Sequence, residues 1–225
     1  MEYMRGLPDR AFDLAIVDPP YGINAPGMSM GNNPNRNDGW KREESTAIKE
    51  KKGRLNQGSG KLKNRALNSL NCDWDFSTPS PEYFVELRRV SKNQIIWGGN
   101  YFDLPPSRCI VCWDKVQPWE NFSQWEMAWT SFDKPAAMFR HSNTGGANAE
   151  MKIHPTQKPV KLYMWLLEKF GNDRPNILDT HLGSASSAIA AHRFNFNFVG
   201  CEIDRDYYQA AKQRFKTETS QQSIF

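Results

Sequence analysis

The stretch Phe12-Asp13-Leu14-Ala15-Ile16-Val17-Asp18-Pro19-Pro20-Tyr21 decides the fold of this chain. Its first six residues form a compact apolar run, which the Pro19-Pro20 pair ends because proline cannot continue the hydrogen bonding of a sheet. The pattern predicts a buried strand followed by a loop. Open α/β sheets bind ligands at the carboxyl ends of their strands, so we expect Asp18 to Tyr21 to lie in a binding site.

These four residue types suit the binding of an exocyclic amine. Such an amine presents two hydrogens, which the Asp18 carboxylate and the Pro19 carbonyl can accept. Pro19 and Pro20 stiffen the turn, and the ring of Tyr21 offers a stacking face worth about 1–3 kcal/mol to a nucleobase. The alternative is an ordinary Pro-Pro turn with a solvated aspartate, and the position after a strand favours the functional interpretation.

Outward from this stretch, strands and helices alternate. We expect strands at 94–97, 108–113, 124–130, 136–140, 176–179 and 197–201, helices at 81–90, 160–170, 184–193 and 204–215, and a frayed tail at 217–225. This alternation predicts an α/β fold with a doubly wound, mostly parallel sheet. The length of 225 residues suits a single domain spanning 1–225.

A second candidate segment runs from Leu178 to Ser187, between a predicted strand and a predicted helix. Small residues there let the backbone approach a ligand, and a helix N-terminus offers free N–H groups. Glu202 follows Gly183 by nineteen residues, at the end of the next strand. An acid at that place binds the ribose of a nucleoside cofactor. The alternative is a capped helix with a surface glutamate.

The third segment, His154-Pro155-Thr156-Gln157-Lys158-Pro159, directly precedes the helix predicted at 160–170. Thr156 or Gln157 can cap the helix, and Lys158 can meet an anion at its positive end. The alternative is a well-capped helix with an exposed lysine and a structural histidine.

Residues 22–71 form a Gly- and Asn-rich insertion without hydrophobic periodicity. Its charge is +6, which leaves −2 for the rest of a chain whose net charge is +4. A flexible basic segment of this kind suits nucleic-acid phosphates, and the alternative is a solvated disordered loop; a short helix is expected near 40–52. The candidate phosphate-binding residues are Lys41, Arg42, Lys49, Lys51, Lys52, Arg54, Lys61 and Lys63. A recognition segment is expected at 114–150.

Composition excludes several classes of protein. No apolar run approaches 18 residues, and the first residues lack the apolar stretch of a signal peptide, so we expect a cytoplasmic protein without a membrane span. Cys109 and Cys112 have zinc-like spacing, but they fall in a predicted strand, where positions three apart face opposite sides. We therefore expect no metal.

Taken together and in this order, the three segments resemble the beta-class DNA amino-methyltransferases. The stretch Gln94 to Phe102 is also similar to small phage and prophage adenine-N6 methylases. The resemblance implies a Rossmann-like methyltransferase fold that uses S-adenosyl-L-methionine to methylate adenine N6 in DNA after base flipping. It also implies DNA as partner, a possible homodimer, and a bacterial or phage-infected host cell.

The resemblance assigns a role to each matching residue. Asp18 and Pro19 accept hydrogen bonds from N6, Pro20 completes the motif, and Tyr21 stacks on the flipped base. The residues implied at the cofactor are Asp179, Gly183, Ser184, Glu202, Thr156 and Lys158. This chain departs from the family pattern at Thr180-His181 and at Ala185, and a strand with an acidic residue that usually precedes a segment such as Leu7-Pro8-Asp9 would fall before Met1.

Three other functions compete with adenine methylation. Cytosine-N4 methylation uses similar chemistry, but families with that activity tend to carry serine where Asp18 stands. A catalytically impaired relative would bind DNA or sense the cofactor without transferring a methyl group. A nicotinamide-dependent dehydrogenase is disfavoured, because the Gly-x-Gly-x-x-Gly pattern is absent from the sequence.

Overall fold

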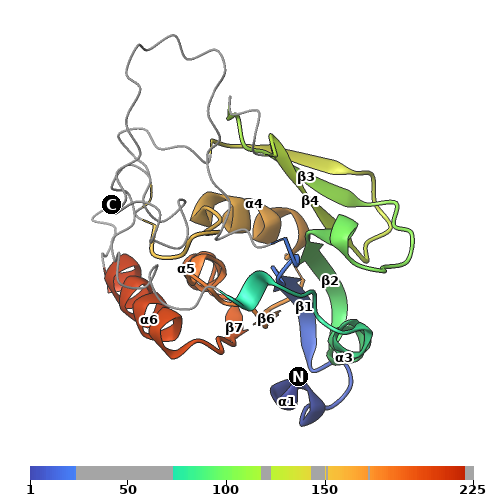
Figure 1. The fold of residues 1–225 in the computed structure, drawn as a ribbon, viewed down its shortest axis with the longest axis horizontal. Helices are drawn as coiled ribbons and strands as arrows, with labels where there is room; N and C mark the ends of the chain where they lie inside the picture. The colour runs from blue at the N-terminus through green and yellow to red at the C-terminus, as the bar shows by residue number, and fades with distance from the viewer. Residues whose placement is uncertain (24–72, 118–122, 143–149, 151, 172, 221–225) are drawn as a thin grey trace, which may run out of the picture.

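A computed structural model describes residues 1–23, 73–117, 123–142, 150, 152–171 and 173–220. These residues form an α/β fold around a seven-stranded sheet with the order β5-β3-β4-β2-β1-β6-β7 (Figure 1). The strands are β1 (Phe12–Val17), β2 (Ser91–Trp97), β3 (Ile110–Asp114), β4 (Trp125–Thr130), β5 (Ala137–Arg140), β6 (Asn176–Asp179) and β7 (Asn197–Gly200). The α-helices are α1 (Glu2–Arg5), α3 (Pro81–Val90), α4 (Val160–Phe170), α5 (Ser186–Arg193) and α6 (Arg205–Ser220), with short 3-10 turns η4 (Asp73–Asp75) and η5 (Gly99–Tyr101).

The sheet is mostly parallel, as the sequence predicts. Strand β1 pairs in parallel with β2 and β6, and β6 pairs in parallel with β7. Strand β4 is inserted antiparallel between β2 and β3. The carboxyl ends of β1, β6 and β7 therefore meet at one edge of the sheet, which is where Asp18, the loop after Asp179, and Glu202 lie.

Helices cover both faces of the sheet because β1 alternates its side chains between two apolar cores. Leu14 and Ile16 are fully buried with apolar residues of α4 and α5. Ala15 and Val17 point the other way and are buried with residues of α1 and α3, such as Leu87. This arrangement explains why every residue of β1 is buried, and it fixes the direction in which the loop after Val17 leaves the sheet.

Two helix boundaries differ from the sequence prediction. Helix α5 starts at Ser186, because Ala185 adopts a left-handed backbone conformation that ends the preceding loop. Helix α6 continues to Ser220, so the expected fraying from 217 onward is wrong for 217–220. Its last turns are held partly by Thr219, whose hydroxyl donates to the Phe215 carbonyl.

Residues 24–72, which hold most of the basic insertion, lie outside the described residues, as do 118–122 and 143–149 of the expected recognition segment. The predicted helix near 40–52 and the candidate phosphate-binding residues fall there too. Among the described residues, no helix has the length and apolar character that crossing a membrane requires. The same residues contain no group of side chains that could hold a metal ion.

Candidate active site

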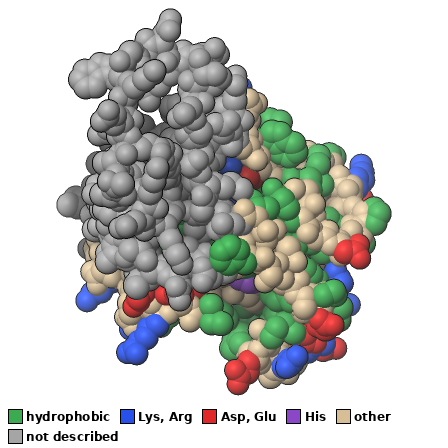
Figure 2. Space-filling model, in the orientation of Figure 1, with side chains coloured by type: hydrophobic (Ala, Val, Ile, Leu, Met, Phe, Trp, Pro, Cys, Tyr) green, Lys and Arg blue, Asp and Glu red, His purple; other side chains and the backbone are tan. Residues whose placement is uncertain are grey.

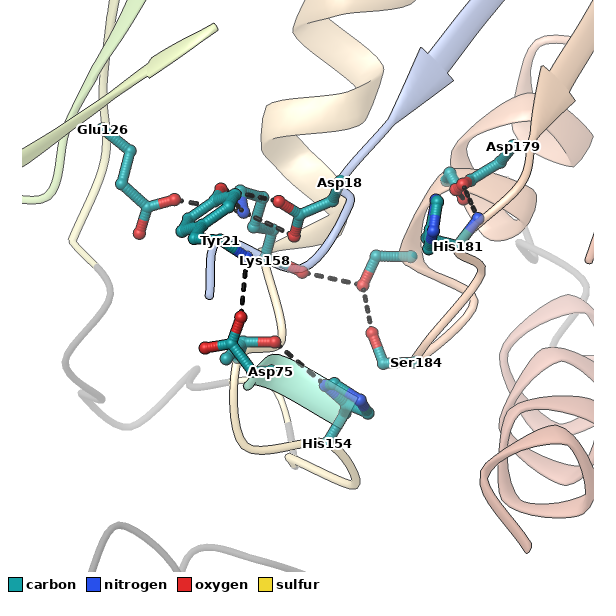
Figure 3. A network of polar contacts seen from close by, with 12 residues as sticks. Asp18, Tyr21, Asp75, Glu126, His154, Lys158, Asp179, His181 and Ser184 are labelled. Atoms are coloured by element: carbon teal, nitrogen blue, oxygen red, sulfur yellow. Dashed lines mark hydrogen bonds and ion pairs between the residues drawn. The ribbon is translucent and has the colours of Figure 1, made fainter. Parts of the chain in front are cut away.

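Asp18 follows β1 directly, and both of its carboxylate oxygens are engaged (Figure 3). The hydroxyl of Tyr21 donates to Oδ1 at 2.7 Å, and the ammonium group of Lys158 donates to Oδ2 at 2.5 Å. The rigid Pro19-Pro20 turn brings Tyr21 back over the carboxylate three residues earlier. Residues 18–21 thus form a closed corner, in which these two hydrogen bonds hold the Asp18 carboxylate in a fixed orientation.

Lys158 connects this corner to strand β4. Its ammonium group forms a second ion pair with Glu126 Oε2 at 3.0 Å, and the other carboxylate oxygen of Glu126 pairs with Lys115 at 2.5 Å. The side chain of Lys158 is only 4% exposed. A cation just before the positive end of α4 is unfavourable on its own. The two carboxylates therefore keep this buried ammonium group in place.

The protonation states of the cluster follow from burial and charge. Burial raises the pKa of Asp18 above its ordinary value, although the charge of Lys158 acts in the opposite direction. Burial alone would raise the pKa of Glu126, but Lys158 and Lys115 lower it to about 2. Burial likewise opposes the charge on Lys158, while Asp18 and Glu126 together raise its pKa. Glu126 is therefore ionised and Lys158 protonated at neutral pH.

Tyr21 is held from several sides. Its ring stacks on Tyr101 with centroids 4.8 Å apart, and Gly98, at φ +70°, leaves the space in which that ring lies. A Cβ atom at Gly98 would come within 2.2 Å of the Tyr21 ring. Asp75 accepts hydrogen bonds from the backbone N–H groups of Tyr21 and Gly22 at 2.6 and 2.9 Å. One face of the Tyr21 ring is thus already covered by Tyr101.

A cavity of about 880 Å³ opens beside this corner. Its walls combine aromatic rings with the charged cluster. They include Asp18, Pro19, Pro20, Tyr21, Trp74, Tyr101, Trp113, Lys115, Trp125, Glu126, Thr156 and Lys158. A cavity of this size, mostly apolar with a few convergent polar groups, is typical of a small-molecule or nucleobase site.

The loop after β6 is organised by Asp179, which is buried. Its carboxylate accepts hydrogen bonds from the His181 backbone N–H at 2.9 Å and from the Ser187 hydroxyl at 2.6 Å. Burial raises its pKa to about 7. Asp179 thus fastens the loop to the first turn of α5. The family resemblance implies a place for Asp179 at the cofactor, and the structure shows its carboxylate in hydrogen bonds with its own loop.

Gly183 and Glu202 meet at the ends of β6 and β7. The N–H of Gly183 donates to Glu202 Oε2 at 2.8 Å, and the N–H of Asp204 donates to Oε1 at 3.0 Å. A Cβ atom at Gly183 would find its nearest neighbour, the His154 ring, 3.9 Å away, so the loop is open on that side. Ile203 is 99% exposed directly after Glu202. An acid beside a bare apolar side chain suits a ribose and the base attached to it.

A buried arginine ties these loops together. Arg214 of α6 donates to the Ser184 carbonyl at 2.7 Å and to the Ser186 hydroxyl oxygen at 2.9 Å. Ser186 in turn donates to the Lys158 carbonyl at 2.7 Å, and Arg214 pairs with Glu150 at 2.9 Å. The loop before α5 and the segment before α4 are therefore fixed relative to each other.

The structure brings some expected residues together and separates others. Asp18, Pro19, Pro20, Tyr21, Thr156 and Lys158 line the cavity. Asp179, Gly183, Ser184 and Glu202 are not among the described residues of its wall. Gly183 is connected to the wall through His154: the His154 ring lies 3.9 Å from where a Cβ atom of Gly183 would stand, and its Nδ1 is 3.1 Å from the Thr156 hydroxyl oxygen.

Sequence reasoning missed Glu126, Asp75, Arg214 and Ile203. For Glu126 the sequence offers no signal, because its partner Lys158 is distant in the chain and on another element. Asp75 stands in the short polar stretch Asp73-Trp74-Asp75, directly after the insertion. The sequence could have indicated Ile203, because this apolar residue directly follows Glu202, which was predicted to bind the cofactor.

The α/β fold of the described residues also occurs among solved structures. TTHA0409 of Thermus thermophilus, assigned as a DNA modification methylase and solved with S-adenosyl-L-methionine, superimposes with a TM-score of 0.52 at 16% identity. The alignment covers 98% of this chain and 92% of that one. This similarity establishes the shared fold.

A family described as DNA methylase, comprising N6 and N4 enzymes, matches residues 97–213. The chain belongs to this DNA methylase family. It is 30% identical over 84 residues to the type II methyltransferase M.HpaI of Haemophilus parainfluenzae, covering 37% of this chain and 27% of that one. It is 23% identical over 148 residues to M2.DpnII of Streptococcus pneumoniae, covering 66% and 51%. The matched region thus spans about half or less of these relatives.

Proposed function

We propose that this protein transfers the methyl group of S-adenosyl-L-methionine to the N6 amino group of an adenine extruded from DNA. The observation that carries the proposal is the closed corner of Asp18, Pro19 and Tyr21 at the edge of the 880 Å³ cavity. In this proposal, the Asp18 carboxylate and the Pro19 carbonyl accept the two hydrogens of one amino group. Family membership supports the reaction class.

The chemistry needs a positioned amine and no covalent enzyme intermediate. The carbon–nitrogen bond forms as the carbon–sulfur bond of the donor breaks, and the electron pair of the broken bond stays on sulfur. Positive charge moves to the amino nitrogen, which then releases one proton to Asp18 or to water. Asp18 and the Pro19 carbonyl aim the nitrogen lone pair and stabilise the charge that grows on it.

The residues around Gly183 fit the donor. A carboxylate has about four acceptor sites, so Glu202 retains capacity for sugar hydroxyls beside its two backbone partners. Ile203 offers an apolar face for the base of the cofactor. We assign Ser184 and the N-terminus of α5 to the methionine end of the cofactor. The donor supplies the activated methyl group, and the protein supplies its position relative to Asp18.

An extruded base finds aromatic surroundings in the cavity. Trp125 is 51% exposed and Tyr101 is 40% exposed, and both border it. Figure 2 shows hydrophobic side chains interspersed with polar side chains and backbone over the described part of the face that it draws. Stacking on such rings offsets part of the few kcal/mol needed to unstack a base. The Tyr21 ring itself already stacks on Tyr101 and has the Lys158 ammonium group 5.6 Å from its centroid, so the exposed rings of Trp125 and Tyr101 are better placed for stacking.

Adenine N6 is proposed over cytosine N4 because an aspartate stands at position 18, where cytosine-N4 families tend to carry serine. The family includes both kinds of enzyme. Incubation with unmethylated bacterial DNA, followed by digestion to nucleosides, separates the two. N6-methyl-2′-deoxyadenosine supports the proposal, and N4-methyl-2′-deoxycytidine replaces it with the alternative.

Substituting Asp18→Ala tests the role of the corner. We expect methyl transfer to fall by at least about 100-fold, because the amine loses its anionic partner. Binding of S-adenosyl-L-methionine, measured by calorimetry, should persist, since Glu202 and Gly183 are untouched. Asp133→Ala, at an exposed surface ion pair with Arg108, is the matched control. Full activity of Asp18→Ala would contradict the assigned role.

A further inference from the structure

The buried cluster contains a cation, Lys158, that the transfer of a methyl group does not itself require. Asp18 alone would attract the positive charge that grows on the amine. Lys158, however, pairs with Asp18 at 2.5 Å and neutralises much of that attraction. A carboxylate fully paired with an ammonium group is a poor partner for a developing cation. The cluster therefore needs a second anion if Asp18 is to act electrostatically.

Glu126 occupies the place where that anion is needed. Its Oε2 lies 3.0 Å from the Lys158 ammonium nitrogen, on the side away from Asp18, as Figure 3 shows. Glu126 projects from β4 and borders the same cavity. Asp18, Lys158 and Glu126 together carry a charge of −1, and Lys115 brings the charge of all four residues to zero. Lys115 contacts the far oxygen of Glu126 and thus lies farthest from Asp18 in this chain of contacts.

We propose that Glu126 is a positioning residue for methyl transfer: it takes up part of the Lys158 charge and so leaves Asp18 with net negative charge toward the amine. The inference rests on the proposed methyl transfer. It assigns Lys158 to the orientation of Asp18 and Glu126, where the resemblance would place it at the cofactor. Glu126 acts through Lys158 and needs no contact with the substrate.

Substitution Glu126→Gln keeps the shape of the side chain and removes its charge. Lys158 then pairs with Asp18 alone. The maximal rate of methyl transfer should fall by about 10- to 100-fold, as for other losses of a preorganised charge. The KM for S-adenosyl-L-methionine should stay within about twofold, because Glu126 is remote from Gly183 and Glu202.

The pH profile separates this role from a purely structural one. Groups that face the cluster are Lys158 and Tyr163 near α4, Lys115 after β3, Tyr21 beside Asp18, and Asp179 at the end of β6. Glu126 raises the pKa of Asp18 by repulsion. Glu126→Gln should therefore move the acid limb of the rate profile to lower pH. A structural defect would lower the rate without moving that limb.

The experiment compares wild type, Glu126→Gln, Glu126→Asp and Glu218→Gln with labelled S-adenosyl-L-methionine and unmethylated bacterial DNA. Glu126→Asp should recover part of the rate because it retains the charge. Glu218→Gln, at an exposed pair with Arg193, should match wild type. An unchanged rate and acid limb in Glu126→Gln would overturn the inference, while an inactive wild type would overturn the proposed function.

A second measurement does not depend on activity. Carbon-13 NMR of the Asp18 carboxyl group, assigned by the loss of its signal in Asp18→Asn, reports the titration of that group directly. A lower midpoint in Glu126→Gln than in wild type supports the electrostatic coupling. The same midpoint in both proteins overturns it, whether or not the protein methylates DNA in the assay.

Discussion

Ala185 has a backbone φ of +62°, in the left-handed region that alanine rarely adopts. Such a conformation costs roughly 1–2 kcal/mol for a residue with a Cβ atom. The methyl group of Ala185 is buried against Ala188 of α5 and Ala211 of α6. Burial of one such group contributes about 0.8 kcal/mol. The contact with α6 therefore offsets much of the strain, which explains how alanine is tolerated in this loop.

This balance predicts a small effect for one substitution and a large loss of stability for another. Ala185→Gly relieves the strain but loses the buried methyl group, so the free energy of unfolding should change by less than about 1 kcal/mol. Ala185→Val adds bulk to a packed site and a branched residue to a left-handed position, so we expect a loss of at least about 2 kcal/mol. Urea unfolding measures both. A loss in Ala185→Gly as large as that expected for Ala185→Val would refute this account.

At the scale of elements, the turn from β6 to α5 depends on one buried acid. Burial raises the pKa of Asp179 to about 7, from an ordinary value of 3.8. The folded protein thus retains this proton over a range in which the unfolded chain has released it. The contribution of Asp179 to stability is therefore complete below about pH 4, and it is lost as the pH rises to 7.

Asp179→Asn should remove this pH dependence, because an amide mimics the protonated acid toward both Ser187 and His181. The difference in unfolding free energy between wild type and variant should shift in favour of the variant from pH 4 to 7, and level off above. Urea unfolding at several pH values measures that difference. Groups that do not interact with Asp179 titrate equally in both proteins, so a constant difference across this range would show that Asp179 is not protonated as described.

Most elements could be predicted because each has a local signature in the sequence. The apolar run at β1 ends at two prolines, and α4 combines helical periodicity with Gly171 at its end. The start of α5 was missed because a left-handed alanine has no such signature. The extension of α6 was missed because its last turns are polar throughout and carry no apolar face.

The site could be predicted only where its residues are close in the chain. Asp18 to Tyr21 form one short corner, and its place after β1 follows from the strand alone. The pairing of Lys158 with Glu126 depends on β4 running antiparallel next to β2, which local pattern does not encode. Long-range ion pairs of this kind are fixed by sheet order, so the sequence could indicate Lys158 as an anion partner but not identify the anion.

For the whole molecule, the distribution of charge separates two tasks. The described residues carry the buried cluster and the cavity, whereas the excess positive charge belongs to residues 22–71. Phosphate contacts supply affinity that depends on salt and carries little sequence information. We therefore expect DNA affinity to depend mainly on the basic insertion, and the choice of the methylated atom to depend on Asp18 and its neighbours.

Neutralising Lys49, Lys51, Lys52 and Arg54 to glutamine tests this division. If all four contact phosphates, the slope of log affinity against log salt concentration should become less steep by about 3 to 4. Fluorescence anisotropy with labelled duplex DNA, from about 50 to about 200 mM salt, measures the slope. The matched control neutralises the exposed residues Arg5, Arg10, Arg88 and Lys92, near the amino ends of β1 and β2. Equal slopes in the two variants would show that the insertion does not bind the DNA backbone.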